Sequence, residues 1–376
     1  MAGHSSAYRT MEISALYLPQ FHEIPENNLF WGDGFTEWTN VCRARPLFPG
    51  HAQPVVPGEL GYYCLLDPAV RERQADLARR HGITSFCYWH YWFGGRRVLE
   101  RPLDEVLASG RPEFPFFVGW ANDSWTGIWY GEPRRLLIEQ TYGGTADDEA
   151  HFASLLPAFL DPRYVHRDGR PVFLVFRPEK LPEPARFVEL WQTLARRVGF
   201  AGLYLVAHLF RHPLYKHHAR DGFDAAVYVD FPFRRSCVTR LREIVQRVVP
   251  CMGPRCYHYA DVLDPMPGRV AGVVHPCAVP NWDNTPRSGR HGTVAMYGSP
   301  EKFERQLTTL LRSELEREMR SDRQLVLIKS WNEWAEGNYL EPDGRHGRAW
   351  LQAVRRARQA AGCPPAAAPM SGGEAP

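Results

Sequence analysis

Short apolar runs recur along the chain, and most of them lack a clean alternation of apolar and polar positions. Runs of this kind are typical of parallel strands that are buried on both faces. We expect eight such strands, at residues 13–18, 84–88, 116–120, 172–176, 203–207, 225–229, 270–274 and 325–328.

Segments in which apolar residues are spaced among charges lie between these runs and predict helices. In residues 68–81, for example, Val70, Ala75, Leu77 and Ala78 stand among charged side chains. The other expected helices are residues 99–109, 147–160, 183–198, 300–320 and 348–361. Residues 234–267 are the hardest part of the chain to assign.

A strand followed by a helix, repeated about eight times, predicts a (β/α)8 barrel of the TIM type in a single domain. A doubly wound sheet is the structural alternative, but no G-x-G-x-x-G turn follows the first expected strand. We expect the barrel to cover residues 12–362. Residues 1–11 form an expected N-terminal tail, and the Pro-, Ala- and Gly-rich residues 363–376 form an expected disordered C-terminal tail.

Aromatic, amide and acidic side chains follow several of the expected strands. Any one group has an ordinary explanation as a turn former or a buried strand end. His208 follows the fifth expected strand and is as easily a core histidine as a ligand, and Asp230 follows the sixth. Their repetition at the same end of successive strands favours a binding site instead. The expected substrate-binding residues from these strand ends are Tyr17, Gln20, His22, Tyr88, His90, Trp92, Trp120, Asn122, Trp125, Trp282, Asp283 and Asn284.

The stretch "SWNEWAEGNYLEPD", residues 330–343, follows the last expected strand and carries Glu333 and Glu336. Two carboxyl groups with different surroundings can act as acid and base, as glycoside cleavage requires. The neighbouring Trp331, Asn332 and Trp334 are expected to line the site, and the indoles to raise one pKa by desolvation. The alternative is a pair of exposed acids in the first turn of a helix.

A third acid, Glu37, lies with Trp38 in the long loop "GDGFTEWTN" after the first strand. We expect these two residues to bind substrate. The sequence does not decide whether Glu37 also has a catalytic role.

Composition narrows the classes of partner. The 376 residues include 45 basic and 42 acidic side chains, and this net charge of +3 is too small to indicate a nucleic-acid groove or a membrane surface. Twelve Trp, sixteen Tyr and twenty Phe exceed what packing usually needs and favour a sugar-binding cleft. No secretory signal and no apolar stretch of about 18 residues is visible, so we expect a cytoplasmic protein without a membrane span.

The eight cysteines contain no C-x-x-C pair. Cys251, Cys256 and His258 could bind a metal, but their spacing fits no standard zinc pattern. We therefore expect structural thiols and no metal site.

Four segments resemble a known family: "ALYLPQFHEIPENNLFWGDGFTEWTNV", "ITSFCYWHYWF", "NWDNTPR" and "LVLIKSWNEWAEGNYLEPD". They are similar to the WbsX-like proteins of bacterial surface-polysaccharide gene clusters, which are related to glycoside hydrolase family 99, the endo-α-mannosidases. The resemblance covers about residues 12–355.

The resemblance implies a (β/α)8 barrel that cleaves α-linked oligosaccharide or polysaccharide, including mannose-containing chains, with retention. It implies that Glu333 is the base acting on the sugar's own 2-hydroxyl and that Glu336 is the general acid, with no metal or other cofactor. The alternatives are a transglycosylase, a glycosyltransferase of O-antigen or capsule biosynthesis, and a non-catalytic glycan-binding barrel. In each case the partner is a glycan, and no nucleic acid is expected.

Overall fold

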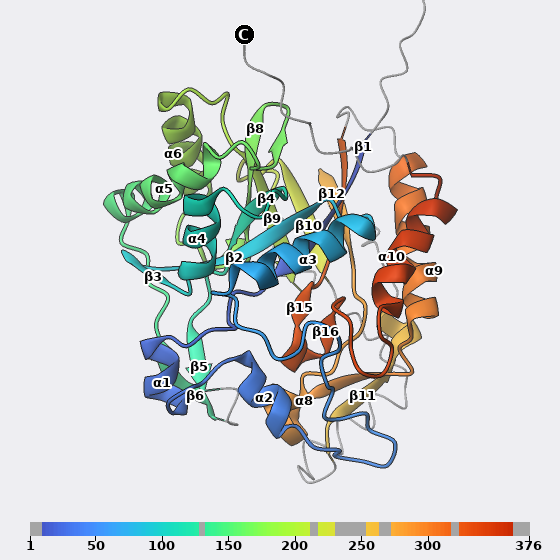
Figure 1. Ribbon diagram of the computed structural model, residues 1–376. Coiled ribbons are helices and arrows are strands. Elements are labelled where there is room, and N and C mark those ends of the chain that lie inside the picture. Colours follow the sequence, from blue (N-terminus) through green and yellow to red (C-terminus); the bar gives the residue numbers. More distant parts are fainter. Residues whose placement is uncertain are drawn as a thin grey trace, which may run out of the picture.

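The computed structural model describes residues 10–127, 132–210, 217–229, 253–262, 272–316 and 323–363. Its centre is a parallel barrel (Figure 1) in the order β1-β14-β12-β10-β9-β8-β4-β2, which closes because β1 also pairs with β2. These strands are β1 (Thr10–Tyr17), β2 (Ser85–Phe93), β4 (Phe116–Trp120), β8 (Arg170–Val175), β9 (Tyr204–Phe210), β10 (Ala225–Val229), β12 (Val273–Ala278) and β14 (Arg323–Ile328). The expected single-domain (β/α)8 barrel is confirmed, and the doubly wound alternative is wrong.

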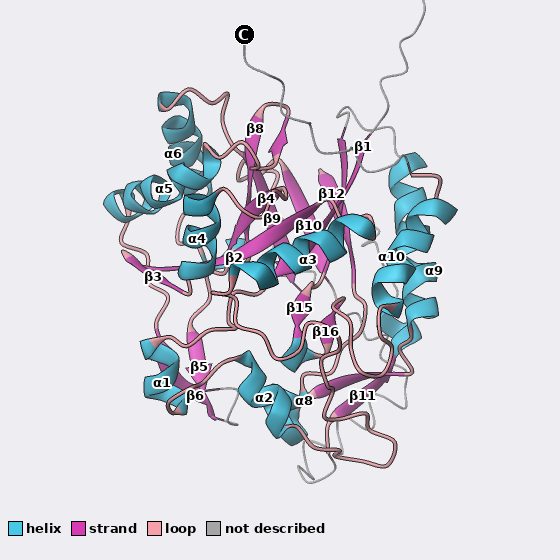
Figure 2. Ribbon diagram, in the orientation of Figure 1, coloured by secondary structure: helices cyan, strands magenta, loops and turns pink. Residues whose placement is uncertain are grey.

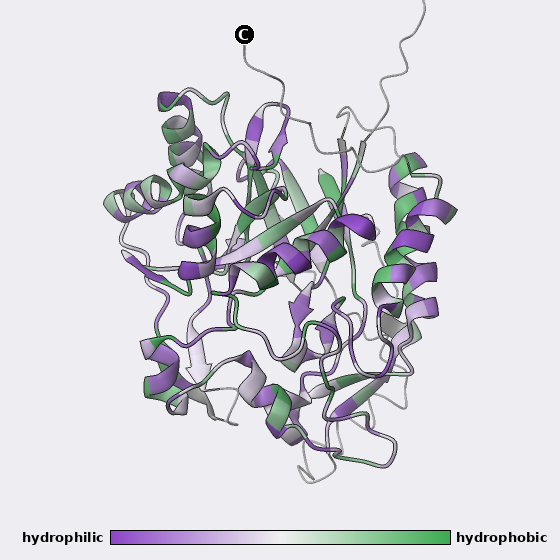
Figure 3. Cartoon of the chain, in the orientation of Figure 1, coloured by the Kyte–Doolittle hydropathy of each residue, from purple (hydrophilic) through white to green (hydrophobic). Residues whose placement is uncertain are grey.

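The barrel strands are buried on both faces, which explains their continuous apolar sequence. Ile13 of β1 is in register with Val326 of β14, and both side chains are fully buried. Figure 3 shows apolar colour along the central strands and hydrophilic colour on much of the surrounding helices. Removal of this apolar surface from water is the main force that holds the barrel together.

Helices cover the outside of the barrel, and α9 and α10 lie side by side against it (Figure 1). The covering helices are α3 (Pro68–Arg80), α4 (Arg101–Ser109), α5 (Thr145–Phe159), α6 (Pro184–Arg197), α9 (Pro300–Glu316) and α10 (Ala349–Ala360). The start of α3 is an example of how local sequence determines where a helix begins. Asp67 caps the helix by accepting the Ala69 N–H at 2.9 Å, and Pro68 at the first position needs no partner for its nitrogen.

The loops at the carboxyl ends of the strands are long and carry short elements of their own, several of which gather below the barrel in Figure 2. They include α1 (Pro25–Trp31), α2 (Glu37–Arg43), α8 (Thr285–Ser288), β5 (Trp125–Gly127), β6 (Glu132–Ile138), β11 (Arg255–His258), β13 (Thr293–Met296), β15 (Asn332–Glu333) and β16 (Asn338–Tyr339). Two further short strands are β3 (Arg96–Val98) and β7 (His166–Arg167). The carboxyl ends therefore carry enough chain to build a site.

Some boundaries differ from expectation. β1 begins at Thr10, inside the expected N-terminal tail, and β2 continues to Phe93, because all nine of its residues are buried. β12 begins at Val273, and residues 263–271 lie outside the described residues. Asp230, Cys251, residues 1–9 and 364–376, and most of the segment 234–267 also lie outside them.

Candidate active site

A cavity of about 320 Å³ lies at the carboxyl ends of the barrel strands. Its apolar walls include Trp31, Trp89, Tyr91, Trp125, Leu137 and Phe176. Its charged lining residues are Asp123, Lys329, Glu333 and Glu336. Apolar walls with a few convergent polar groups are typical of a small-molecule site, and barrels of this kind carry their sites at this end.

The turn that carries Glu333 and Glu336 is fixed to the end of β1. Asn332 accepts the Leu18 N–H at 2.8 Å and donates to the Leu18 carbonyl at 3.1 Å, as a second strand would. The Trp331 N–H donates to the carbonyl of Leu16 at 2.7 Å. These contacts hold the two residues that precede Glu333 in place.

Trp334 stands between the two acids and is held on two sides. Its ring stacks on Tyr339 with centroids 4.0 Å apart, and its indole N–H donates to Glu341 at 2.6 Å. Glu341 also accepts from Gln74 at 2.7 Å and from Tyr63 at 2.9 Å. Burial raises the pKa of Glu341 to about 7, against these hydrogen bonds. A turn with this many buried contacts presents its carboxyl groups in a fixed arrangement.

The same turn packs tightly against α8. Gly337 has a φ of +59°, and a Cβ there would lie 2.8 Å from the Asp283 nitrogen. The Asp283 N–H in turn donates to the Glu336 carbonyl at 2.7 Å. Only glycine suits this position, because it accepts the left-handed backbone and leaves room for the close approach.

Asp283 organises the start of α8 from within the protein. One carboxylate oxygen accepts from His51 at 2.8 Å and Gln53 at 2.7 Å, and the other accepts from the Thr285 N–H at 3.0 Å and the Thr285 hydroxyl at 2.6 Å. Although burial raises its pKa, these hydrogen bonds outweigh burial and hold the pKa below the usual value. Asp283 thus fixes the short helix that carries Arg287.

Arg287 joins the three glutamates of the predicted site. Its Nη2 lies 2.8 Å from Glu37 and 2.9 Å from Glu333, and its Nη1 lies 2.7 Å from Glu336. Glu37 also accepts the Ala335 N–H at 2.9 Å. Although burial lowers the pKa of Arg287, the carboxylates outweigh burial and raise it. Arg287 therefore stays charged.

The two acids of the turn have pKa values shifted in opposite directions. Burial and then the nearby charge of Glu336 raise the pKa of Glu333 to about 7. Burial also raises that of Glu336, but Lys329 and Arg287 outweigh burial and lower it overall. For Glu37, burial outweighs Arg287, and its pKa is raised. Because three carboxyl groups face two cations, a proton on Glu333 leaves the cluster neutral.

Three of the predicted site residues line the cavity: Trp125, Glu333 and Glu336. The alternative of exposed helical acids is wrong, because the Glu333 side chain is 8% exposed and that of Glu336 is 19% exposed. Other predicted residues form a supporting layer. These are Gln20, Glu37, Trp38, Trp331, Asn332, Trp334, Asp283 and Asn284, together with Trp282, whose ring lies 5.1 Å from the Lys329 ammonium.

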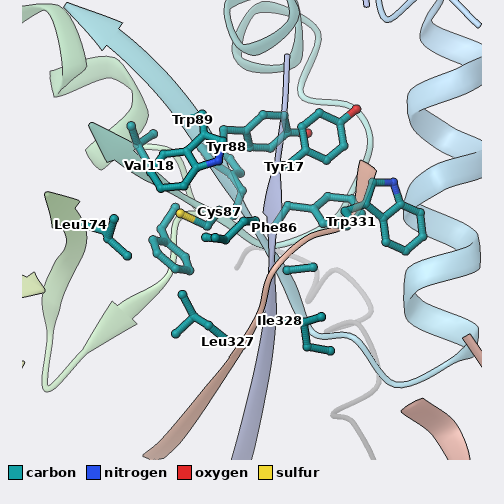
Figure 4. Packing of buried hydrophobic residues seen from close by; sticks show 14 of the residues in the cluster. Tyr17, Phe86, Cys87, Tyr88, Trp89, Val118, Leu174, Leu327, Ile328 and Trp331 are labelled. Atoms are coloured by element: carbon teal, nitrogen blue, oxygen red, sulfur yellow. The ribbon is translucent and has the colours of Figure 1, made fainter. Parts of the chain in front are cut away.

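The remaining predicted residues are buried and are not among those that line this cavity: Tyr17, His22, Tyr88, His90, Trp92, Trp120 and Asn122. Side chains alternate between the two faces of a strand, and the predicted residues of β2 lie on the face away from this cavity. Tyr88 packs on Tyr17 with centroids 4.5 Å apart (Figure 4), and His90 meets His151 of α5. The intervening Trp89 and Tyr91 face the cavity instead. In β2 the residues that line this cavity are therefore the neighbours of those that the sequence predicts, and ligand contacts at Tyr88, His90 and Trp92 stay a prediction.

Several lining residues were not expected in the site from the sequence, among them Lys329 and Phe176. Strand position could have found them, because Lys329 directly follows β14 and Phe176 directly follows β8. The sequence left open whether His208 is a core residue or a ligand. Its side chain is buried, and its ring centroid lies 4.9 Å from that of Phe176. Burial and then the charge of Lys329 lower its pKa to about 3, so it is neutral.

Within the described ranges, no three His, Cys, Asp or Glu side chains converge as a metal site would require. Likewise, no helix in the described part of the chain has both the length and the apolar composition to cross a membrane. Six cysteines fall in those parts of the chain, and all six are free thiols.

The closed parallel barrel, with buried carboxyl groups beside an aromatic cavity at its carboxyl end, defines a (β/α)8 protein whose site is built on its βα loops. A family model described as "Glycosyltransferase WbsX" matches residues 13–354, and the chain belongs to this family. The description places the family among carbohydrate-active enzymes. The expected resemblance is confirmed.

Curated relatives come from two strains of Xanthomonas campestris pv. campestris, B100 and ATCC 33913, and are described as "Uncharacterized protein WxcX". Each is 37% identical over 364 residues, which is 93% of this chain and 51% of the relative. The chain therefore spans about half the length of these relatives.

Solved structures with the same fold include the GH99 endo-alpha-mannosidase from Bacteroides thetaiotaomicron, with a TM-score of 0.56 and 13% identity over 93% of this chain and 98% of that one. Its complex with bis-tris propane gives a TM-score of 0.55 at 13% identity, over 92% and 95% of the two chains. A "Glycoside hydrolase-like protein" gives 0.56 at 11% identity, over 95% and 96%. At these identities the likeness concerns the fold.

Proposed function

We propose that this protein is an enzyme that acts on glycosidic bonds in an α-linked oligosaccharide or polysaccharide, with Glu333 and Glu336 as its acid and base. Mannose-containing chains are the first candidates. Water is the acceptor in hydrolysis, and a sugar hydroxyl takes its place in transglycosylation. The chemistry needs no metal or other cofactor.

One observation carries this proposal. Glu333 and Glu336 reach the same cavity from one fixed turn, both contact Arg287, and their pKa values are shifted in opposite directions. A pair of carboxyl groups kept in different protonation states is what acid–base cleavage of an acetal requires. A purely structural pair would not need an adjacent aromatic cavity.

The cavity walls support a sugar as the ligand. Trp89, Tyr91, Trp125 and Phe176 offer flat apolar surfaces, on which the C–H faces of a sugar ring can pack. Tyr91 and Trp125 are arranged edge to face with centroids 5.4 Å apart, so they form a corner. The α-mannosidic candidate comes from the name of the structural relative, an endo-alpha-mannosidase.

The free protein favours a particular division of labour. Glu333, with a pKa of about 7, holds the proton and donates it to the leaving oxygen as the C1–O bond breaks. Glu336 is ionised and takes the proton of the sugar's own 2-hydroxyl as that oxygen attacks C1. Water then attacks C1 of the resulting intermediate and gives one proton to Glu333, and Glu336 returns its proton to the sugar oxygen that leaves C1. These roles are the reverse of those implied by the family resemblance.

The roles can be tested through the leaving group. Loss of a general acid is rescued by a substrate with an activated aryl leaving group, whereas loss of the base is not. We expect Glu333→Gln to cleave an aryl glycoside far better than a natural glycan, relative to wild type. Rescue of Glu336→Gln instead would restore the roles that the resemblance implies.

A glycosyltransferase is the second candidate, and the description of the matched family favours it. Incubation with a panel of nucleotide sugars, read by release of the nucleotide, separates the two. Product formed from an unactivated glycan supports the first proposal. Nucleotide release that requires an acceptor glycan supports the second, and glycan binding without any product leaves a non-catalytic binding barrel.

A further inference from the structure

Lys329 is the cation that lines the cavity in the described part of the chain, and neither acid–base role uses it. It directly follows β14, and its backbone N–H donates to the Ala278 carbonyl of β12 at 2.9 Å. Its side chain is 11% exposed and lines the cavity. The ammonium lies 3.6 Å from Oε2 of Glu336 and 5.1 Å from the centroid of the Trp282 ring.

Lys329 and Arg287 approach different oxygen atoms of the Glu336 carboxylate. Arg287 contacts Oε1 at 2.7 Å, and Lys329 approaches Oε2, so each oxygen faces one cation. Arg287 is shared with Glu37 and Glu333, whereas Lys329 forms an ion pair with Glu336 alone among the ion pairs found in the described parts of the chain. Lys329 is therefore the cation that distinguishes Glu336 from the other two acids.

Apart from Glu37 and Glu333, the ionisable groups around this pair do not change charge near pH 7. Arg287 stays charged, and burial keeps His208 and Tyr91 neutral near pH 7. Burial also raises the pKa of the Cys277 thiol to about 12, although Lys329 opposes this. The groups that face Glu336 and Lys329 from the surrounding elements are Arg287 of α8, Glu37 of α2, Glu333 of β15, His208 of β9, Tyr91 of β2 and Cys277 of β12.

We propose that Lys329 is a positioning residue that keeps Glu336 ionised, so that the single proton of the acid pair stays on Glu333. The proposal deepens the acid–base function and rests on it for its catalytic meaning. Its physical basis is an opposite charge within a few ångström of a buried carboxylate, which stabilises the charged form. Trp282 keeps the ammonium in place by offering its ring face to the cation.

A merely structural lysine would fill space beneath Trp282 and leave the protonation of Glu336 unchanged. The two roles differ in a quantity that can be measured without any substrate. The test compares Lys329→Met, which keeps the length of the side chain, with Lys329→Arg, which keeps the charge. Lys302→Met is the matched control, because Lys302 is half-buried at the start of α9 and its ammonium contacts the Tyr297 carbonyl at 2.6 Å and no carboxylate in the described residues.

The measurement is a pH titration of the protein labelled with 13C at the glutamate side-chain carboxyl carbon, read by NMR and assigned with Glu333→Gln and Glu336→Gln. We expect the titration of Glu336 to shift upward in Lys329→Met, to stay near wild type in Lys329→Arg, and to be unchanged in Lys302→Met. A Glu336 titration in folded Lys329→Met that coincides with wild type overturns the proposal. Near-UV circular dichroism establishes that the variant is folded.

Should Lys329→Met not fold, Lys329→Gln gives the same comparison with a polar, neutral side chain. With a substrate in hand, the acid limb of the kcat/KM profile should move to higher pH in the neutral variants and return in Lys329→Arg. A protein that turns over no glycan, yet shows the NMR shift, contradicts the proposed function and leaves the role of Lys329 in ionising Glu336 standing.

Discussion

The guanidinium of Arg287 lies 2.8 Å from the carboxylate of Glu37, which has no exposed surface, although the two residues are 250 positions apart in the sequence. This contact joins the loop after β1 to the loop after β12, and Arg287 also reaches the turn after β14 through Glu333. One buried cation thus joins three βα loops of the barrel. The site depends on it both for shape and for charge.

Replacement of Arg287 should be strongly destabilising. Arg287→Met leaves three carboxyl groups close together without their shared cation, and loss of one partner of a buried ion pair costs about 3–5 kcal/mol. We expect that decrease in the free energy of unfolding, measured by urea denaturation. Arg290→Met is the control on the adjacent turn, and because Arg290 is exposed we expect a change within about 0.5 kcal/mol. Equal stability of the two variants would contradict the structural role of Arg287.

The activity should have a bell-shaped pH profile with an optimum below 7. Glu336 must be ionised, and its pKa is lowered, so kcat/KM increases with pH through the acidic range as Glu336 loses its proton. Glu333 must be protonated, and its pKa is about 7, so kcat/KM falls as pH increases through that value. The measurement is kcat/KM from about pH 4 to 9 on the best substrate. A profile that keeps rising above pH 8 would be inconsistent with Glu333 as the acid.

Much of the barrel was predictable because its strands are continuous apolar runs. β4 and β10 have the boundaries that the sequence predicts, residues 116–120 and 225–229. Which face of β2 meets the cavity was not predictable, because all nine residues are buried, six of them are Phe, Tyr or Trp, and no polar face marks the cavity. Polarity gives no guidance where both faces of a strand are covered.

The acid pair was predictable from its local sequence, since Glu333 and Glu336 lie on one short turn with two indoles. The role of Arg287 was not, since the local motif "NWDNTPR" indicates only a turn. Its partners come from loops distant in the sequence, and only the closure of the barrel brings them together. Contacts of this kind depend on tertiary structure and leave no periodic pattern.

The cavity wall formed by Trp125 of β5 and Tyr91 of β2, and the position of Tyr88 on the other face of β2, can be tested by ligand binding. Trp125→Ala removes a wall that also packs on Tyr91, and we expect about tenfold weaker glycan binding, which corresponds to about 1.4 kcal/mol. Tyr88→Phe should leave affinity unchanged, because its ring packs on Tyr17 away from the cavity. Tyr297→Ala, at an exposed position, is the aromatic-to-alanine control. Isothermal titration calorimetry gives the affinities, and a larger loss in Tyr88→Phe than in Trp125→Ala would refute the assignment.

A buried histidine pair should make stability depend on pH. His90 and His151 lie with Nε2 atoms 3.0 Å apart, and burial lowers the pKa of His90 to about 3. Because the folded-state pKa is below the unfolded value of about 6.5, stability is fully present above pH 6.5 and is lost as pH falls toward 3. His90→Gln should reduce this pH slope by up to about 1.4 kcal/mol per pH unit. The exposed His258→Gln is the control, and an unchanged slope in His90→Gln would contradict the assignment.

The most direct test of the account is product formation from a panel of α-linked glycans, including α-mannans, read by mass spectrometry. Wild type is compared with Glu333→Gln, Glu336→Gln and the control Glu189→Gln, an exposed acid on α6. We predict cleavage or transfer by wild type and Glu189→Gln, and losses of about 10²–10⁴-fold in each cavity variant, the usual size of an acid–base contribution. Turnover in folded Glu333→Gln and Glu336→Gln equal to that of wild type would contradict the central claim.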